Sequence, residues 1–179
     1  MPIDGLTLRP ARPDDALCLR VLGVQVYLDT YATGGIRPSL AREVLAEFSE
    51  QATEAMLADA QSRLIVAERD GHLIGFAQLR LRATQPLAPA GRQAALARLY
   101  VQAPFAGRGL GRCLVADVER RAREADADVL WLQVWAHNAR ARAFYARCGF
   151  IDCGQVWYAF EDERHENRVL AKSLVAARA

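Results

Sequence analysis

A glycine-rich segment is the part of the sequence whose residue types and spacing point most directly to chemistry. Residues Phe105–Arg112 read FAGRGLGR and lie between a predicted strand and a predicted amphipathic helix. Alternating glycines let the backbone pass close to a ligand, and the N–H groups at a helix N-terminus converge on negative charge. The segment is therefore a candidate phosphate cradle.

Two common nucleotide-binding motifs do not fit this segment. No Gly-Lys-Ser/Thr follows it, as a Walker A loop requires, and Arg112 stands where the third glycine of GxGxxG belongs. The next predicted strand ends Val134-Trp135-Ala136, without the acid that would bind a ribose hydroxyl. A nucleotide-binding protein that uses the glycines otherwise, and a turn with glycines for geometry only, stay open as alternatives.

A second candidate lies on the predicted helix from Asn138 to Cys148. Asn138 falls at the N-cap, where capping alone would explain it. Tyr145 lies on the same face two turns later, about 10 Å along the axis. It also falls on an apolar stripe with Phe144 and Cys148, so a packing role for its ring is the competing interpretation.

Alternating strands and helices must position these segments. Strands are predicted at Leu6–Arg9, Arg63–Glu68, His72–Arg82, Ala94–Val101, Val129–Trp135, Ile151–Phe160 and Arg168–Leu174. Asp70-Gly71 predicts a tight hairpin between the second and third of these strands, and the third alternates so that Gln78, Arg80 and Arg82 face solvent. Helices are predicted at about Pro13–Asp29, Pro38–Phe48, Gln51–Gln61, Arg108–Ala125 and Asn138–Cys148. The fourth of these has an apolar face on which Leu110, Leu114, Val118 and Ala122 recur every four residues. The strand, helix and strand within residues 94–135 predict a right-handed βαβ crossover with parallel strands. The predicted class is α+β or α/β, with a mixed sheet.

Composition limits the classes of partner. The 179 residues suit one domain over residues 1–179, and 23 basic against 21 acidic residues, interspersed, do not predict nucleic acid binding. The longest run without a charged residue, 129–139, is shorter than the roughly 20 residues of a membrane span, and no signal peptide is readable. We expect no membrane partner and a cytoplasmic protein.

The cysteines and histidines show no metal-binding spacing. The four cysteines, Cys18, Cys113, Cys148 and Cys153, contain no C-x-x-C pair, and the three histidines lie far apart. We therefore expect no metal and no disulfide framework, and interpret each cysteine as a small, buried apolar residue in a reducing compartment.

Taken together, these segments resemble the GNAT-type N-acetyltransferase superfamily over most of the chain. The motifs that carry the resemblance are Leu8-Arg9-Pro10-Ala11 with Asp14-Asp15-Ala16, Leu99-Tyr100-Val101, Gly107–Gly111, Asn138 with Ala141, Phe144-Tyr145 and Cys148-Gly149-Phe150. It implies an α+β, three-layer fold with a mixed, mostly antiparallel sheet of about seven strands flanked by helices. Strands 94–101 and 129–135 would form a parallel, splayed pair. One departure is Ala106, where the family's motif begins with Gln or Arg; the backbone amides do not depend on that side chain.

The resemblance also implies the reaction. It is direct attack of a primary amine on acetyl-CoA, with no metal and no covalent enzyme intermediate. Tyr145 would be the catalytic residue that protonates the departing thiolate, since a phenol is protonated at neutral pH. The implied acetyl-CoA contacts are Leu99, Tyr100, Val101, Gly107, Arg108, Gly109, Leu110, Gly111, Arg112 and Asn138. An acyl-CoA-binding sensor without turnover is the main alternative.

The acceptor side is predicted from aromatic and acidic residues. Tyr27, Asp29, Tyr31 and Trp157, with the acidic turn Glu161-Asp162-Glu163, would suit a cationic small-molecule amine, and packing roles are the competing interpretation. Segments 98–101 and 169–174 look like those of PaiA-type polyamine acetyltransferases. Arg98 stands against a cationic acceptor if it faces that site, so a protein N-terminus or an amino acid is the other candidate. The oligomeric state is left open, a homodimer included.

Overall fold

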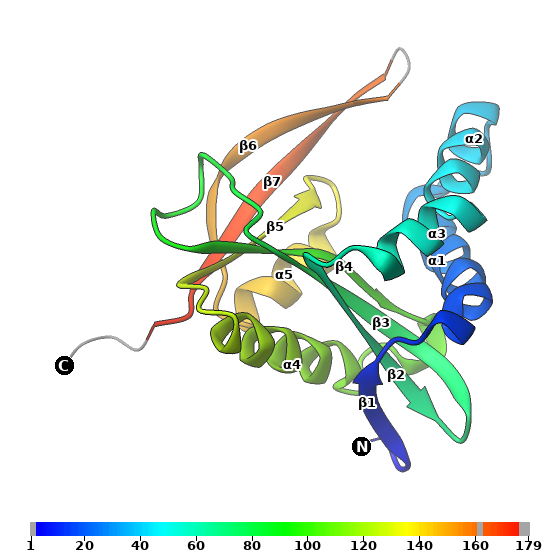
Figure 1. The fold of residues 1–179 in the computed structure, drawn as a ribbon. Coiled ribbons are helices and arrows are strands. Elements are labelled where there is room, and N and C mark those ends of the chain that lie inside the picture. The colour runs from blue at the N-terminus through cyan, green and yellow to red at the C-terminus, as the bar shows by residue number, and fades with distance from the viewer. Residues whose placement is uncertain (1–2, 161–162, 176–179) are drawn as a thin grey trace. The chain divides into compact units, whose positions relative to one another are not determined.

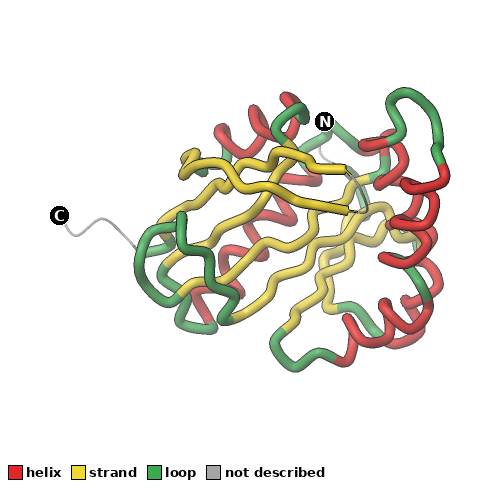
Figure 2. Tube along the Cα trace, turned by 90° about the horizontal axis from the view of Figure 1, so that it is seen from above, coloured by secondary structure: helices red, strands yellow, loops and turns green. Residues whose placement is uncertain are grey.

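The fold is a seven-stranded mixed sheet accompanied by five α-helices and two short 3-10 helices, in a computed structural model that describes residues 3–160 and 163–175. The strand order is β1-β2-β3-β4-β5-β7-β6, and Figures 1 and 2 show the strands side by side with the helices beside them. The strands are β1 Leu6–Pro10, β2 Ser62–Arg69, β3 His72–Leu81, β4 Gln93–Val101, β5 Val129–Trp135, β6 Ile151–Phe160 and β7 Glu163–Ser173. The helices are η1 Pro13–Asp15, α1 Ala16–Tyr31, α2 Pro38–Glu47, α3 Glu50–Ala58, η2 Ala103–Phe105, α4 Leu110–Glu124 and α5 Ala139–Arg147.

The chain forms two compact units, whose boundaries fall inside β3, β4 and α4. The first unit contains the described part of residues 1–78 together with Arg98–Ala116, and the second contains Leu79–Ala97 together with the described part of 117–179. Within the described ranges, no helix is both long and apolar enough to cross a bilayer.

In the first unit, α1, α2 and α3 pack over an apolar core that includes Leu19, Val44, Phe48 and Phe76. Gly23 makes this packing possible: a Cβ there would lie 2.3 Å from the Phe48 ring, so only a glycine lets that ring lie against α1. The hairpin between β2 and β3 turns through Asp70 and Gly71 with φ of 50° and 77°, as the Asp-Gly signal predicted.

In the second unit, β5 forms parallel pairs with β4 and antiparallel pairs with β7. The parallel ladder joins Gln93–Ala95 to Val129–Trp131, whereas the whole of β5 pairs with residues Asn167–Ser173 of β7. β6 and β7 continue as a long hairpin (Figure 1), with an irregularity between Asp152 and Gly154. The parallel β4/β5 pair confirms the predicted crossover.

Most predicted elements are confirmed. The predicted burial of the cysteines was wrong, since Cys18 and Cys113 are exposed and Cys148 and Cys153 are half-buried. Three further details were wrong. The α3 helix ends at Ala58 rather than near Gln61, and β7 begins at Glu163 rather than Arg168. Gln78 was predicted to face solvent but is buried, because its amide is hydrogen-bonded to Ser62 and Arg98.

Candidate functional site

The glycine turn before α4 has the geometry of an anion-binding loop. Gly107 and Gly109 have φ of 75° and 90°, and a Cβ added at either position meets no atom within 4 Å. Leu110 begins the helix, and Cys113 N–H donates to the Gly109 carbonyl at 3.1 Å. The N–H groups of the three residues from Leu110 to Arg112 therefore precede the first i to i−4 bond, as is typical of a helix N-terminus. Arg108 and Arg112 are exposed beside them.

A glycine on β3 holds this turn in place. A Cβ at Gly75 would lie 2.7 Å from the Tyr100 carbonyl oxygen and 3.5 Å from Leu110 Cδ2. The missing side chain lets the end of β4 and the first residue of α4 approach β3 together. Leu110 is buried there, and Gln102 N–H donates to the Ile74 carbonyl at 3.1 Å. The predicted segments Leu99–Val101 and Gly107–Arg112 thus both pack against β3 at Gly75.

Tyr100 faces an aromatic cluster of the first unit. Its ring centroid lies 5.1 Å from that of Phe76 and 5.9 Å from that of Phe48. The segment Leu99–Val101 lies beyond the three residues of β4 that pair with β5. Backbone groups of this segment are therefore outside the parallel ladder.

Asn138 and Tyr145, the predicted residues of the second unit, lie on one short helix. Asn138 caps α5 through its Oδ1 atom, which accepts a hydrogen bond from Ala141 N–H at 3.0 Å. Tyr145 is partly buried, with its ring centroid 5.2 Å from that of Phe144 and 5.7 Å from that of Phe150. The helix cap thus uses the Oδ1 atom of Asn138, and the packing uses the ring of Tyr145. The Tyr145 hydroxyl takes no part in these ring contacts.

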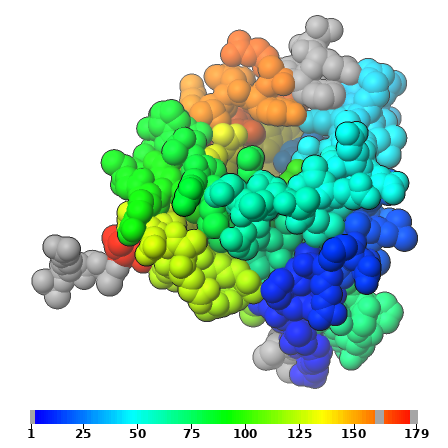
Figure 3. All heavy atoms as spheres, viewed as in Figure 1, coloured from blue at the N-terminus to red at the C-terminus, as the bar shows by residue number. Residues whose placement is uncertain are grey.

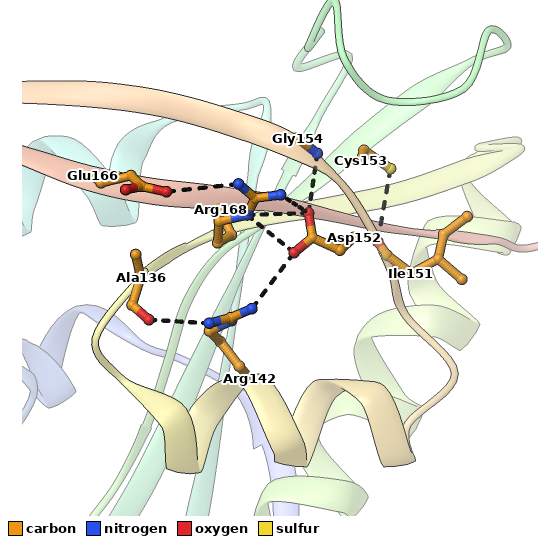
Figure 4. Close-up of polar contacts among 8 residues, drawn as sticks. All are labelled: Ala136, Arg142, Ile151, Asp152, Cys153, Gly154, Glu166 and Arg168. Carbon is orange, nitrogen blue, oxygen red and sulfur yellow. Dashed lines mark hydrogen bonds and ion pairs between the residues drawn. The ribbon is translucent and has the colours of Figure 1, made fainter.

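A charged network ties α5 to the β6/β7 hairpin (Figure 4). Arg168 Nη2 donates to Asp152 at 2.7 Å, and Arg142 of α5 lies 3.7 Å from the same carboxylate. Arg142 also donates to the Ala136 carbonyl at 3.2 Å, just after β5. The Arg168 guanidinium holds the pKa of Asp152 below its usual range. These contacts fix the start of the helix that carries Asn138 and Tyr145.

The predicted acceptor residues belong to both compact units. Tyr27 and Tyr31 lie one turn apart on α1, with ring centroids 4.5 Å apart, whereas Asp29 is exposed and by helical spacing lies on another face. Trp157 belongs to the second unit, where the Arg164 guanidinium already lies 5.1 Å from its ring centroid. Glu161 and Asp162 lie outside the described residues.

The sequence analysis missed two carboxylates on α2 that approach the predicted residues. Glu43 lies close enough to Tyr27 to raise the pKa of its hydroxyl. Glu47 forms an ion pair with Arg98, whose guanidinium carbon lies 6.0 Å from the Phe48 ring centroid. The available signal was their i, i+4 spacing, which places both carboxylates on one face of the helix.

Burial and the charge of Glu43 raise the pKa of Tyr27 and of Tyr31. Both phenols are therefore neutral at physiological pH.

Comparison with known proteins identifies the family of this chain. Residues 33–150 match the acetyltransferase (GNAT) family. An aminoglycoside N(6')-acetyltransferase type 1 of Stenotrophomonas maltophilia is 30% identical over 158 residues, which cover 85% of this chain and 90% of that protein. An uncharacterized N-acetyltransferase from the pepI 3' region of Lactobacillus delbrueckii subsp. lactis is 28% identical over 153 residues, covering 84% and 87% of the two chains.

The fold is also found among solved structures. The PaiA N-acetyltransferase of Thermoplasma acidophilum, solved in complex with coenzyme A, superposes with a TM-score of 0.76 over 94% of this chain and 98% of that one, at 19% identity. The seven-stranded sheet with its parallel β4/β5 pair is common to the two folds. With the family match over most of its length, this chain belongs to the GNAT family of acetyl-CoA-dependent N-acetyltransferases.

Proposed function

We propose that this enzyme transfers the acetyl group of acetyl-CoA to a primary amine of a small molecule, within one N-acetyltransferase domain. The observation that carries the proposal is the turn Gly107–Arg112, where two glycines have positive φ and open space at the Cβ position, directly before the first amides of α4. Amides in that arrangement bind phosphate oxygens. The guanidinium groups of Arg108 and Arg112 would add charge-assisted contacts to the pyrophosphate.

The segment Leu99–Val101 would hold the acyl end of the same molecule. Its position beyond the β4/β5 ladder supports this role, because backbone groups that do not pair with a neighbouring strand can bind a ligand. A backbone N–H there would polarise the thioester carbonyl. Asn138 would contact the cofactor arm through its amide nitrogen or backbone, since its Oδ1 atom caps α5.

The proposed reaction is direct attack by a neutral amine. The amine nitrogen forms a bond to the thioester carbonyl carbon, the carbon–sulfur bond breaks, and the amine releases a proton. The Tyr145 hydroxyl would donate a proton to the thiolate sulfur as that bond breaks. Its place on the capped helix α5 supports this role, because the helix is anchored by Arg142 and Asp152.

The small-molecule acceptor is supported by the name of the Stenotrophomonas relative, which gives an aminoglycoside as its acceptor. Thiol release from acetyl-CoA with spermidine, simple diamines, amino acids and short peptides tests the proposal. We expect turnover with small amines, and a preference for peptides would overturn the acceptor class. A parallel thermal shift should show stabilisation by acetyl-CoA and not by NAD or ATP.

A further inference from the structure

Helix α5 ends two residues after Tyr145, in a turn that backbone hydrogen bonds close. Gly149 has a φ of 87° just after the helix, and its N–H donates to the Ala146 carbonyl at 3.0 Å. Phe150 N–H donates to the Tyr145 carbonyl at 3.1 Å, which completes a Schellman motif. The ring centroid of the buried Phe150 lies 5.7 Å from that of Tyr145, the apolar contact that accompanies this motif. The last turn of α5 therefore sets where the Tyr145 side chain lies.

Lys172 of β7, in the same compact unit, contacts the end of this helix. Its Nζ atom donates to the Cys148 carbonyl at 2.8 Å, and a Cβ at Gly149 would lie 3.5 Å from the Lys172 Cε atom. An ammonium group at this place complements the negative end of the helix dipole and gives a helix-end carbonyl a donor. The backbone of Lys172 pairs with Leu130 in the β5/β7 ladder. Lys172 thus connects the last turn of α5 to the sheet.

A buried carboxylate of α4 holds the Lys172 ammonium group. Glu119 Oε1 accepts a hydrogen bond from Lys172 Nζ at 2.6 Å, although Glu119 is only 8% exposed. The outer side of α4, yellow-green in Figure 3, lies at the surface, whereas Glu119 belongs to its buried side. A carboxylate taken out of water needs a cation close by, so Glu119 keeps the ammonium group in place. Arg123 also approaches Glu119, at 3.3 Å, but its Nε atom donates to the Leu174 carbonyl and not to α5.

The proton donor of the proposed reaction must lie at hydrogen-bond distance from the thiolate sulfur, so a small displacement of its helix lowers the rate. The first turn of α5 is fixed by the Asn138 cap and by Arg142, which leaves the last turn to Lys172. We propose that Lys172, held by Glu119, is a positioning residue for Tyr145, because it fixes the turn from which the phenol projects. This inference rests on the proposed function and gives Lys172 no contact with the reacting atoms.

The test is a double-mutant cycle between Lys172→Met and Tyr145→Phe, measured as kcat for thiol release. Methionine keeps the apolar stem of the lysine and removes its ammonium group. In the wild-type background, Lys172→Met should lower kcat about 10- to 100-fold, the cost of displacing a reacting group by up to about 1 Å. In the Tyr145→Phe background it should lower kcat less than about threefold, because residues that act as a unit are not additive. Acetyl-CoA affinity, measured by calorimetry, should stay within about threefold of wild type in both backgrounds.

Arg123→Met is the matched control. Arg123 approaches the same carboxylate and donates to a backbone carbonyl, but that carbonyl is not part of α5. Its loss should therefore change kcat less than about threefold in either background. Where Lys172→Met alone does not fold, the double variant Glu119→Gln/Lys172→Met removes both charges of the pair and should give the same two kcat ratios.

Hydrogen exchange tests the contact with α5 without turnover. The amides of Cys148, Gly149 and Phe150, which close the last turn, should exchange at least about tenfold faster in Lys172→Met than in wild type. In Arg123→Met they should exchange at the wild-type rate.

Three results would overturn the proposal: unchanged exchange of these amides, equal kcat losses from Lys172→Met in the two backgrounds, or a loss of acetyl-CoA affinity in place of kcat. The role proposed for Tyr145 fails separately, if Tyr145→Phe alone leaves kcat unchanged. That result removes the positioning role as well, while hydrogen exchange still shows whether Lys172 fixes the turn.

Discussion

The Arg98 guanidinium forms an ion pair with the Glu47 carboxylate while it lies 6.0 Å from the centre of the Phe48 ring. Its positive charge, which the sequence analysis set against a cationic acceptor, is therefore balanced by a carboxylate of α2. The same guanidinium donates to the buried amide oxygen of Gln78. Arg98 thus links the sheet to α2 and holds in place the helix that carries Glu43.

Replacing Arg98 by Met should destabilise the protein. The buried Gln78 oxygen would lose its donor, and an unsatisfied buried polar group costs about 1–3 kcal/mol. Urea unfolding at pH 7 measures the change. Glu47→Gln is the control, since Glu47 is 42% exposed and an exposed ion pair contributes less than about 1 kcal/mol. Equal losses for the two variants would contradict the role assigned to Gln78.

Replacing Gly109 by Val should weaken acetyl-CoA binding at least about tenfold. A valine strains the backbone at φ of 90° and places a branched side chain in the open space beside Gly109, directly before the first amides of α4. Gly71→Val is the matched control, because Gly71 also has a positive φ and open space but lies in the β2/β3 hairpin. Calorimetry with acetyl-CoA should separate the two variants, and unchanged affinity in a folded Gly109→Val variant would exclude this turn as the binding site.

Much of the fold could be predicted because its signals are local in sequence. The four-residue repeat of Leu110, Leu114, Val118 and Ala122 predicted the buried face of α4, and all four side chains are buried. The start of β7 was missed because its first residues are polar, and their pairing with β6 is made by backbone atoms, which leave no pattern in the side chains. The end of α3 was missed because Asp59 accepts a hydrogen bond from Gln61 N–H at 2.8 Å, a local turn that competes with the helix.

The candidate site likewise has parts that local sequence signals predict and parts that they do not. The glycine turn and α5 could be predicted because each is one continuous segment with a recognisable start. Glu43 could not, because its neighbour Tyr27 lies on a different helix, and only tertiary packing brings the two together. The burial of Gln78 was missed for the same reason: its partners Ser62 and Arg98 lie on other strands.

Asp15 gives a prediction for the pH dependence of stability. Its buried carboxylate accepts two hydrogen bonds from Arg9, at 2.7 and 2.9 Å, and one from Arg12 N–H at 2.7 Å. The bonds from Arg9 hold the pKa of Asp15 below its ordinary value of about 3.9. A carboxyl with a lowered native pKa stabilises the fold above the unfolded pKa, and this contribution is lost as pH falls through the native value.

Asp15→Asn should therefore lower the free energy of unfolding by about 1.5–3 kcal/mol at pH 7. The difference from wild type should be constant down to about pH 5 and should shrink below about pH 4. Urea unfolding at pH 7, 5, 4 and 3 measures it. The exposed neighbour Asp14 provides the control, since Asp14→Asn should change stability by less than about 0.5 kcal/mol. A gap between Asp15→Asn and wild type that persists undiminished at pH 3 would refute this account.

Tyr145→Phe should lower kcat by about 10² to 10⁴, the range for losing a general acid, while acetyl-CoA affinity stays within about threefold of wild type. Phenylalanine keeps the ring contacts with Phe144 and Phe150, so a large loss cannot be assigned to packing. Tyr158→Phe removes a hydroxyl from an exposed tyrosine of the same unit and should leave kcat unchanged. Steady-state thiol release with the best amine measures both variants. If Tyr145→Phe stays within a few-fold of wild type, the residue serves the apolar stripe of α5 and another group protonates the thiolate.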